Sequence, residues 1–227
     1  MMEEYQMKKI LSMLLCFCLL GAQMSVRAAE KNEYLILINS ENPLPEDYAL
    51  VFKDDFVDVK STRDDGRPPQ KLRKAAAEAL EELSAAAAEA GFSNISVTSA
   101  YRSREYQKQL FDGAVERYLA RGMTKKEALH LTKRYFAEPG KSEHESGLAV
   151  DMHHLSCASL AFAETAEYRW LSEHAHLYGF ILRYPEGKEK ITGIAFEPWH
   201  FRYVGKEAAA EIYASGLCLE EYLNKIS

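Results

Sequence analysis

Residues 142–151 read SEHESGLAVD, and residues 197–203 read EPWHFRY. Both stretches place metal-capable or charged side chains inside segments that otherwise have the apolar and aromatic character of buried strands. Asp151 closes an apolar run, where an unpaired carboxylate would be costly and a bound cation would remove that cost. The two stretches therefore decide both the fold and the chemistry that we expect.

His144, Asp151 and His200 form a candidate set of metal ligands. A catalytic zinc ion takes about three protein nitrogen or oxygen ligands plus a water, and two imidazoles with one carboxylate supply such a set. Gly147 lets the backbone turn tightly, so that the side chains of His144 and Asp151 can converge on one point.

Two further histidines compete for this role. His153 and His154 follow Asp151 directly, but neighbours on a strand point to opposite faces, so at most one of them can face the site easily. A lone histidine is also commonly structural, and the spacing between His144 and Asp151 occurs in many unrelated sequences. The residues alone leave a metal site and a purely structural role open.

Glu197 is the candidate general base. It lies three residues before His200, close enough to sit beside a metal-bound water without being a ligand. Zinc lowers the pKa of its water to about 7, so a nearby carboxylate needs only to take the proton and pass it to the leaving amine.

The remaining pattern predicts an α+β domain. Apolar spacing and stop signals indicate helices over residues 70–90, 103–120, 124–137, 163–178 and 206–215, the last of which we expect to end the fold. Strand character is found over residues 34–38, 95–99, 148–152, 180–184, 191–196 and 199–204. Because strands cluster late, we expect a small antiparallel sheet that carries the zinc site and packs against several helices.

The N-terminus has the features of a secretory signal. Lys8 and Lys9 precede an apolar run over residues 10–20, and Val26 and Ala28 are small residues placed for signal peptidase. The run is shorter than the roughly 20 residues that span a bilayer, so we expect no permanent transmembrane span. We predict a signal over residues 1–28, an irregular lead-in over 29–67 and a catalytic domain over 68–227, located outside the cytoplasmic membrane.

The net charge of the chain argues against nucleic acid as a partner. The chain has 28 basic and 34 acidic residues, a net charge of −6, so no overall basic field attracts nucleic acid, and we expect none as a partner. Of the cysteines outside the signal, Cys157 and Cys218 are compatible either with a disulfide or with two free thiols. Oligomeric state is left open.

The motifs together resemble a known family. Ser142-x-His144-x-x-Gly147-x-Ala149-x-Asp151 and Glu197-x-x-His200, with Tyr101-Arg102-Ser103 upstream, are similar to the signature of VanY-type D-alanyl-D-alanine carboxypeptidases. These belong to the zinc fold group shared with lysostaphin-type endopeptidases and the hedgehog signalling domain. The resemblance covers roughly residues 42–204.

The resemblance implies an enzyme that removes the terminal D-alanine from peptidoglycan stem peptides. It implies that Zn²⁺ is held by His144, Asp151 and His200, and that Glu197 is the base. It also assigns Arg102 to the scissile carbonyl or the substrate carboxylate, which suits a permanently charged guanidinium. Gln107 and Ser142 are placed near the peptide.

Three alternatives stay open at this stage. An L,D-carboxypeptidase that trims the tetrapeptide stem uses the same zinc, base and arginine. A catalytically silent, zinc-bearing module that binds cell-wall peptide would lack a working base, and Glu197 argues against it. A wall-lytic endopeptidase fits the Arg102 and Glu197 elements less well.

Overall fold

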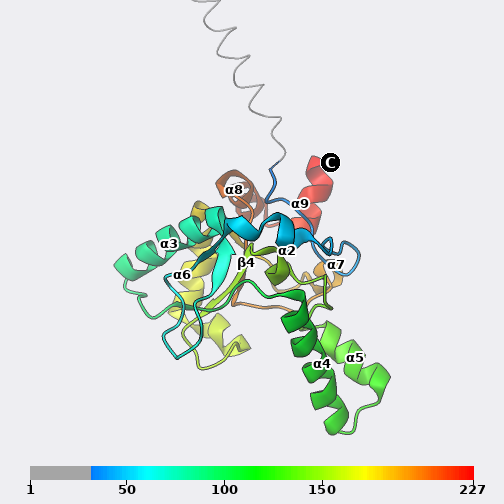
Figure 1. Cartoon of the computed structure of the whole chain (residues 1–227). Helices are drawn as coiled ribbons and strands as arrows, with labels where there is room; N and C mark the ends of the chain where they lie inside the picture. The colour runs from blue at the N-terminus through cyan, green and yellow to red at the C-terminus, as the bar shows by residue number, and fades with distance from the viewer. Residues whose placement is uncertain (1–31) are drawn as a thin grey trace, which may run out of the picture. The chain divides into compact units, whose positions relative to one another are not determined.

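A four-stranded antiparallel sheet forms the centre of the fold (Figure 1). The computed structural model describes residues 32–227, of which Tyr34–Ser227 form one compact unit. The strands lie in the order β3 (Ser96–Ser99), β4 (Ala149–His153), β6 (His200–Tyr203) and β5 (Phe180–Leu182). In the β4–β6 pair, Asp151 lies directly opposite His200. Residues opposite each other share a face of the sheet, so the register itself brings these two side chains together.

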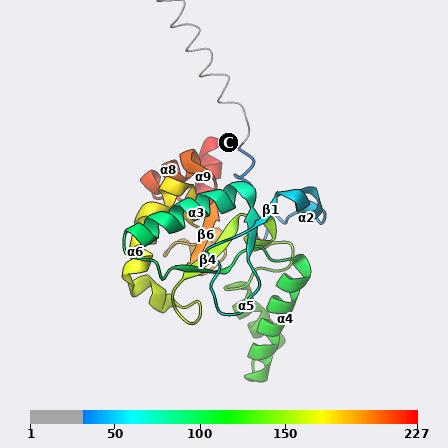
Figure 2. The same cartoon turned by 60° about the vertical axis from the view of Figure 1, so that its left-hand side comes forward.

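The two faces of the sheet differ in character. Val150, Met152 and Phe201 point into the main apolar core, where helix α3 (Lys74–Glu89) contributes Leu80 and Leu83. Helix α6 (Ala166–His174), which follows η4 (Leu160–Glu164) and continues into η5 (Ala175–Tyr178), packs into the same core, and Figure 2 shows α3 crossing over the strands. The alternate residues of β4 and β6 therefore lie on the opposite face.

Two helices form a hairpin that projects from the sheet in both views (Figures 1 and 2). Helix α4 (Arg104–Ala120) begins at Ser103, whose hydroxyl accepts a hydrogen bond from the Tyr106 amide. Helix α5 (Lys125–Lys133) begins with a capping box, in which Thr124 and Glu127 satisfy each other's backbone amides. The capping residues fix where each helix starts and hence the direction of the hairpin.

Shorter elements surround the sheet. A two-stranded antiparallel sheet pairs β1 (Phe56–Asp58) with β2 (Lys71–Arg73), and α2 (Tyr48–Val51) and η2 (Lys53–Asp55) precede it. The short 3₁₀ helix η3 (Glu143–Ser146) leads into β4. In the chain, α7 (Glu189–Thr192) follows β5 and precedes β6. Helices α8 (Lys206–Ser215) and α9 (Leu219–Ile226) form a second apolar cluster with Ile181 and Val204.

The α+β class and the late antiparallel sheet are confirmed, but several elements differ from expectation. Residues 34–38 form no strand, and residues 191–196 are not a strand because they contain the end of α7 and a turn at Gly193, whose φ is 77°. The helix expected over residues 70–90 begins only at Lys74, because residues 71–73 form β2 and pair with β1. Helix α9 was not expected.

The expected secretory signal, residues 1–28, lies outside the described residues. Within residues 32–227, no helix has the length and apolar character needed to span a membrane. Cys157 is exposed and Cys218 is buried, and both are free thiols. The boundary that we expect after residue 67, between the lead-in segment and the catalytic domain, remains a prediction.

Candidate active site

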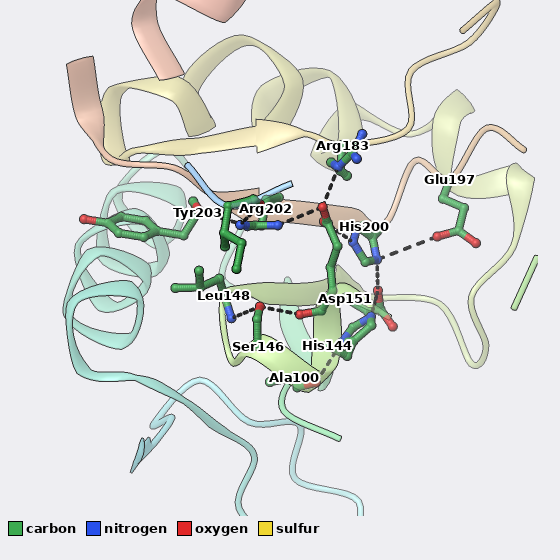
Figure 3. Close-up of polar contacts among 12 residues, drawn as sticks. Ala100, His144, Ser146, Leu148, Asp151, Arg183, Glu197, His200, Arg202 and Tyr203 are labelled. Atoms are coloured by element: carbon green, nitrogen blue, oxygen red, sulfur yellow. Dashed lines mark hydrogen bonds and ion pairs between the residues drawn. The ribbon is translucent and has the colours of Figure 1, made fainter. Parts of the chain in front are cut away.

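His144, Asp151 and His200 meet on the polar face of the sheet (Figure 3). His144 comes from η3, Asp151 from β4 and His200 from β6, and all three are buried. Asp151 Oδ1 lies 3.3 Å from His144 Nε2 and 3.2 Å from His200 Nδ1. One carboxylate oxygen therefore lies between two imidazole nitrogens that come from distant parts of the chain.

This arrangement fits a zinc ion. Ligand atoms about 2.0–2.2 Å from a tetrahedral zinc lie about 3.3–3.6 Å from one another, close to the observed spacing. Asp151 Oδ1 is buried and has no hydrogen-bond partner among the described residues. Buried polar atoms are normally satisfied, so this oxygen indicates a place for a cation. The donor set of two imidazoles and one carboxylate is also a common one for catalytic zinc.

Neighbouring groups determine the tautomer of His144 and the charges of His144 and Asp151. His144 Nδ1 lies 2.7 Å from the carbonyl oxygen of Ala100, which selects the tautomer with Nε2 free to bind metal. Burial and the nearby Arg102 charge lower the pKa of His144 to about 4, so its ring is neutral. Burial opposes ionisation of Asp151, but His144, His200 and Arg102 hold its pKa well below the usual value.

The rival histidines do not join this cluster. His153 Nε2 lies 3.1 Å from Thr98 Oγ1, and its Nδ1 lies 3.3 Å from Arg63 Nη2. His154 lies 3.7 Å from the carboxylate of Glu167 and packs edge-on against Phe162. Neither ring belongs to the group of possible metal ligands formed by His144, Asp151 and His200.

Glu197 lies beside the three ligands. Its Oε2 is 3.7 Å from His200 Nδ1, and its side chain lines the same cavity while being 6% exposed as a residue. Burial, helped by the negative charge of Asp151, raises the pKa of Glu197 to about 8 against the opposing effect of His200. A carboxyl group with a pKa near neutrality can both accept and return a proton.

Arg102 is fixed by three contacts. It donates to Asp151 Oδ2 at 2.8 Å, to Ser99 Oγ at 2.9 Å and to Gln107 Oε1 at 3.4 Å. Arg102 thus contacts the candidate metal ligand Asp151, which sequence reasoning did not foresee, and it also lines the cavity. Gln107 is almost fully buried and donates to the Ala137 carbonyl at 2.8 Å, so it also ties α4 to the segment after α5.

A cavity of about 330 Å³ opens over the site. Such a volume suits a small peptide end. Ser142 and the sequence-expected site residues line it, and so do residues that sequence analysis did not assign to the site. These are Tyr135, Phe136, Ala137, Glu143, Ala158, Tyr184, Ile194 and Trp199. Most are apolar and lie in irregular segments, where periodicity gives no signal.

These features define the class of protein as a metallopeptidase with a zinc-type centre: two imidazoles and an aspartate share one point, and a buried glutamate stands beside them. A family model described as VanY, D-alanyl-D-alanine carboxypeptidase, matches residues 69–206. A D-alanyl-D-alanine carboxypeptidase of Enterococcus faecalis is 40% identical over 195 residues, which cover 86% of this chain and 67% of the relative. The chain belongs to the VanY family of D-alanyl-D-alanine carboxypeptidases.

Two solved structures show how similar the fold is. The vancomycin resistance D,D-pentapeptidase VanY, as a mutant in complex with Zn(II), is 41% identical with a TM-score of 0.68, covering 84% of this chain and 98% of that one. The LD-carboxypeptidase LdcB is 38% identical with a TM-score of 0.72, covering 83% of this chain and 85% of that one. The α+β fold agrees with both neighbours, and the candidate zinc site agrees with the Zn(II) complex of VanY.

Proposed function

We propose that this protein is a zinc-dependent carboxypeptidase that hydrolyses the terminal D-alanine from peptidoglycan stem pentapeptides. The observation that carries the proposal is the unpartnered Asp151 Oδ1 between His144 Nε2 and His200 Nδ1, with Glu197 beside it. Membership of the VanY family supplies the substrate class.

The chemistry is divided among the zinc site, Glu197 and Arg102. When bound by His144, Asp151 and His200, zinc would acidify a water and polarise the scissile carbonyl. Glu197, buried beside the candidate ligands, would take the proton of the attacking water and return it to the leaving amine of D-alanine. Arg102, held by Asp151, offers a fixed positive charge to the substrate carbonyl or carboxylate.

The cavity walls then select the end of a peptide. Phe136, Tyr184 and Trp199 supply apolar surface, and Ser142 and Arg102 supply polar contacts. We assign Ser142 to the substrate peptide and Gln107 to holding Arg102 and the Ala137 carbonyl in place. A cavity of this limited volume favours release of one terminal residue over cleavage within a long chain.

A digest of defined muropeptides tests the proposal. Purified protein is incubated with pentapeptide and tetrapeptide stems, and the products are read by mass spectrometry, with chelator and with chelator followed by zinc. We expect loss of one alanine from the pentapeptide, abolition by chelator and recovery with zinc. If neither stem loses mass under any condition, the exopeptidase function is wrong.

A second candidate is the L,D-carboxypeptidase reaction on the tetrapeptide stem. The likeness to LdcB, at 38% identity, favours it, and the zinc, base and arginine would serve both reactions. The same digest distinguishes the two, since preferential trimming of the tetrapeptide assigns the L,D activity.

We also propose that the enzyme acts outside the cytoplasmic membrane after removal of residues 1–28. Stem peptides lie there, and Lys8, Lys9 and the apolar run over residues 10–20 support the proposal. N-terminal sequencing of exported protein is expected to begin at Ala29. Uncleaved protein in the cytoplasm would contradict it.

A further inference from the structure

A buried network of charges lies behind the zinc ligand His200. Glu143 Oε1 accepts hydrogen bonds from Arg183 Nε at 2.7 Å and Arg202 Nη1 at 2.8 Å. Arg183 also forms a bidentate pair with Glu220 of α9, at 2.8 and 2.6 Å. Glu143, Arg183 and Arg202 are at most 1% exposed. Neither the ligand set nor the catalytic steps described above use these side chains.

One oxygen of this network faces the metal ligand. Glu143 Oε2 lies 3.5 Å from His200 Nε2, and both atoms are buried with no hydrogen-bond partner among the described residues. Each is the group that would satisfy the other, a ring N–H and a carboxylate oxygen. Histidines that bind metal through one nitrogen generally donate the other N–H to such an oxygen.

We propose that Glu143 is a positioning residue that holds His200 in the tautomer able to bind zinc. With Nε2–H directed at Glu143, the lone pair of Nδ1 faces Asp151 Oδ1 and the metal position. The inference rests on the zinc site of the proposed function and adds to it a residue that acts on the metal through His200.

The surroundings of Glu143 keep its carboxylate in place. Arg202, besides its bond to Glu143, donates to the backbone carbonyls of Tyr34 and Ile36. Arg183 is held by Glu220, so α9 and the segment around residue 36 both anchor the arginines. Two guanidiniums on one buried carboxylate keep it ionised and acceptor-only, which forces the facing imidazole nitrogen to be the donor.

Glu143→Gln tests the role while preserving shape. To keep its oxygen on the two arginines, the glutamine must turn its NH₂ toward His200 Nε2, which favours the tautomer with the proton on Nδ1. We expect zinc affinity to fall about 10- to 100-fold. Glu145→Gln is the matched control: Glu145 is a buried carboxylate in the same turn, paired with Arg104 at 3.0 Å, and it faces no metal ligand.

Zinc affinity is measured by competition with a chromophoric chelator, after circular dichroism confirms that each variant is folded. A loss in Glu143→Gln with unchanged affinity in Glu145→Gln supports the inference. Equal affinity of Glu143→Gln and the unsubstituted protein overturns it while leaving the proposed function intact. An unsubstituted protein that binds no zinc overturns both.

A measurement on the unsubstituted protein removes dependence on folding of the variant. In zinc-loaded protein labelled with ¹⁵N-histidine, we expect the His200 Nε2 resonance to carry a proton that is shifted downfield and protected from solvent exchange. An unprotonated Nε2, or a proton that exchanges as in a free imidazole, would refute the assigned contact.

Discussion

Glu197 combines burial with a position next to the ligands, and these two properties explain its proposed role better than its spacing in the sequence. The carboxyl group lies 3.7 Å from His200 Nδ1, and its pKa is raised to about 8 by burial and by Asp151. Glu197→Gln keeps the shape but cannot take up a proton. We expect about a 10²- to 10⁴-fold loss in kcat with zinc content unchanged, measured by D-alanine release and elemental analysis. Activity within a few-fold of the unsubstituted enzyme would show that another group moves the proton.

Gly147 is required by the backbone at the turn between two ligands. Its φ is 68°, and a Cβ at this position would overlap the ring of Phe56. We expect Gly147→Ala to lower the free energy of unfolding by about 3 kcal/mol, from left-handed strain and overpacking together. Gly187→Ala is the control, because Gly187 has a φ of 81° with open space around it and should cost only about 1–2 kcal/mol. Equal losses in denaturant titrations would argue against the Phe56 contact.

At the scale of elements, helix α9 holds the buried side chain of Arg183 in place. Glu220 supplies both oxygens to the fully buried Arg183. Glu220→Gln replaces one charged acceptor with a donor, and we expect a loss of about 2–3 kcal/mol in unfolding free energy. Glu82→Gln breaks an exposed pair with Lys206 and should cost less than about 1 kcal/mol. A Glu220→Gln loss as small as the Glu82→Gln loss would mean that the buried pair adds little stability.

The sequence predicted those elements whose signals are local. The apolar spacing over residues 124–137 and the strand character of residues 148–152 predicted α5 and β4 close to their observed positions. Residues 191–196 misled because Ile191 and Thr192 are β-branched, although Gly193 ends a helical turn there. Helix α9 was missed although its apolar residues, Leu219, Tyr222, Leu223 and Ile226, recur at helical spacing.

The candidate site could be predicted only in part. His144, Asp151 and His200 belong to short motifs, so their residue types pointed to a metal. Glu143 lies within one of these motifs, but its contacts with Arg183 and Arg202 exist only once β5 and β6 are paired. The contact of Arg102 with Asp151 likewise depends on β3 lying next to β4.

At the scale of the whole molecule, zinc binding is linked to the release of a proton. Without a bound ion, burial lowers the pKa of His200, but the carboxylates of Asp151 and Glu143 outweigh this effect and raise the pKa to about 9. Zinc requires the neutral ring, so at pH 7 binding must displace a proton. We expect affinity to rise about tenfold per pH unit between pH 6.5 and 8.5. Calorimetry in buffers of different ionisation enthalpy would detect the proton, and affinity that is independent of pH would contradict this linkage.

Anomalous scattering from a crystal of the zinc-loaded protein, with data collected on both sides of the zinc absorption edge, tests the central claim most directly. The account predicts a single strong peak within bonding distance of His144 Nε2, Asp151 Oδ1 and His200 Nδ1, with Glu197 beside it and outside the ligand set. A peak at His153 or His154, or no peak at the three ligands at saturating zinc, would contradict it.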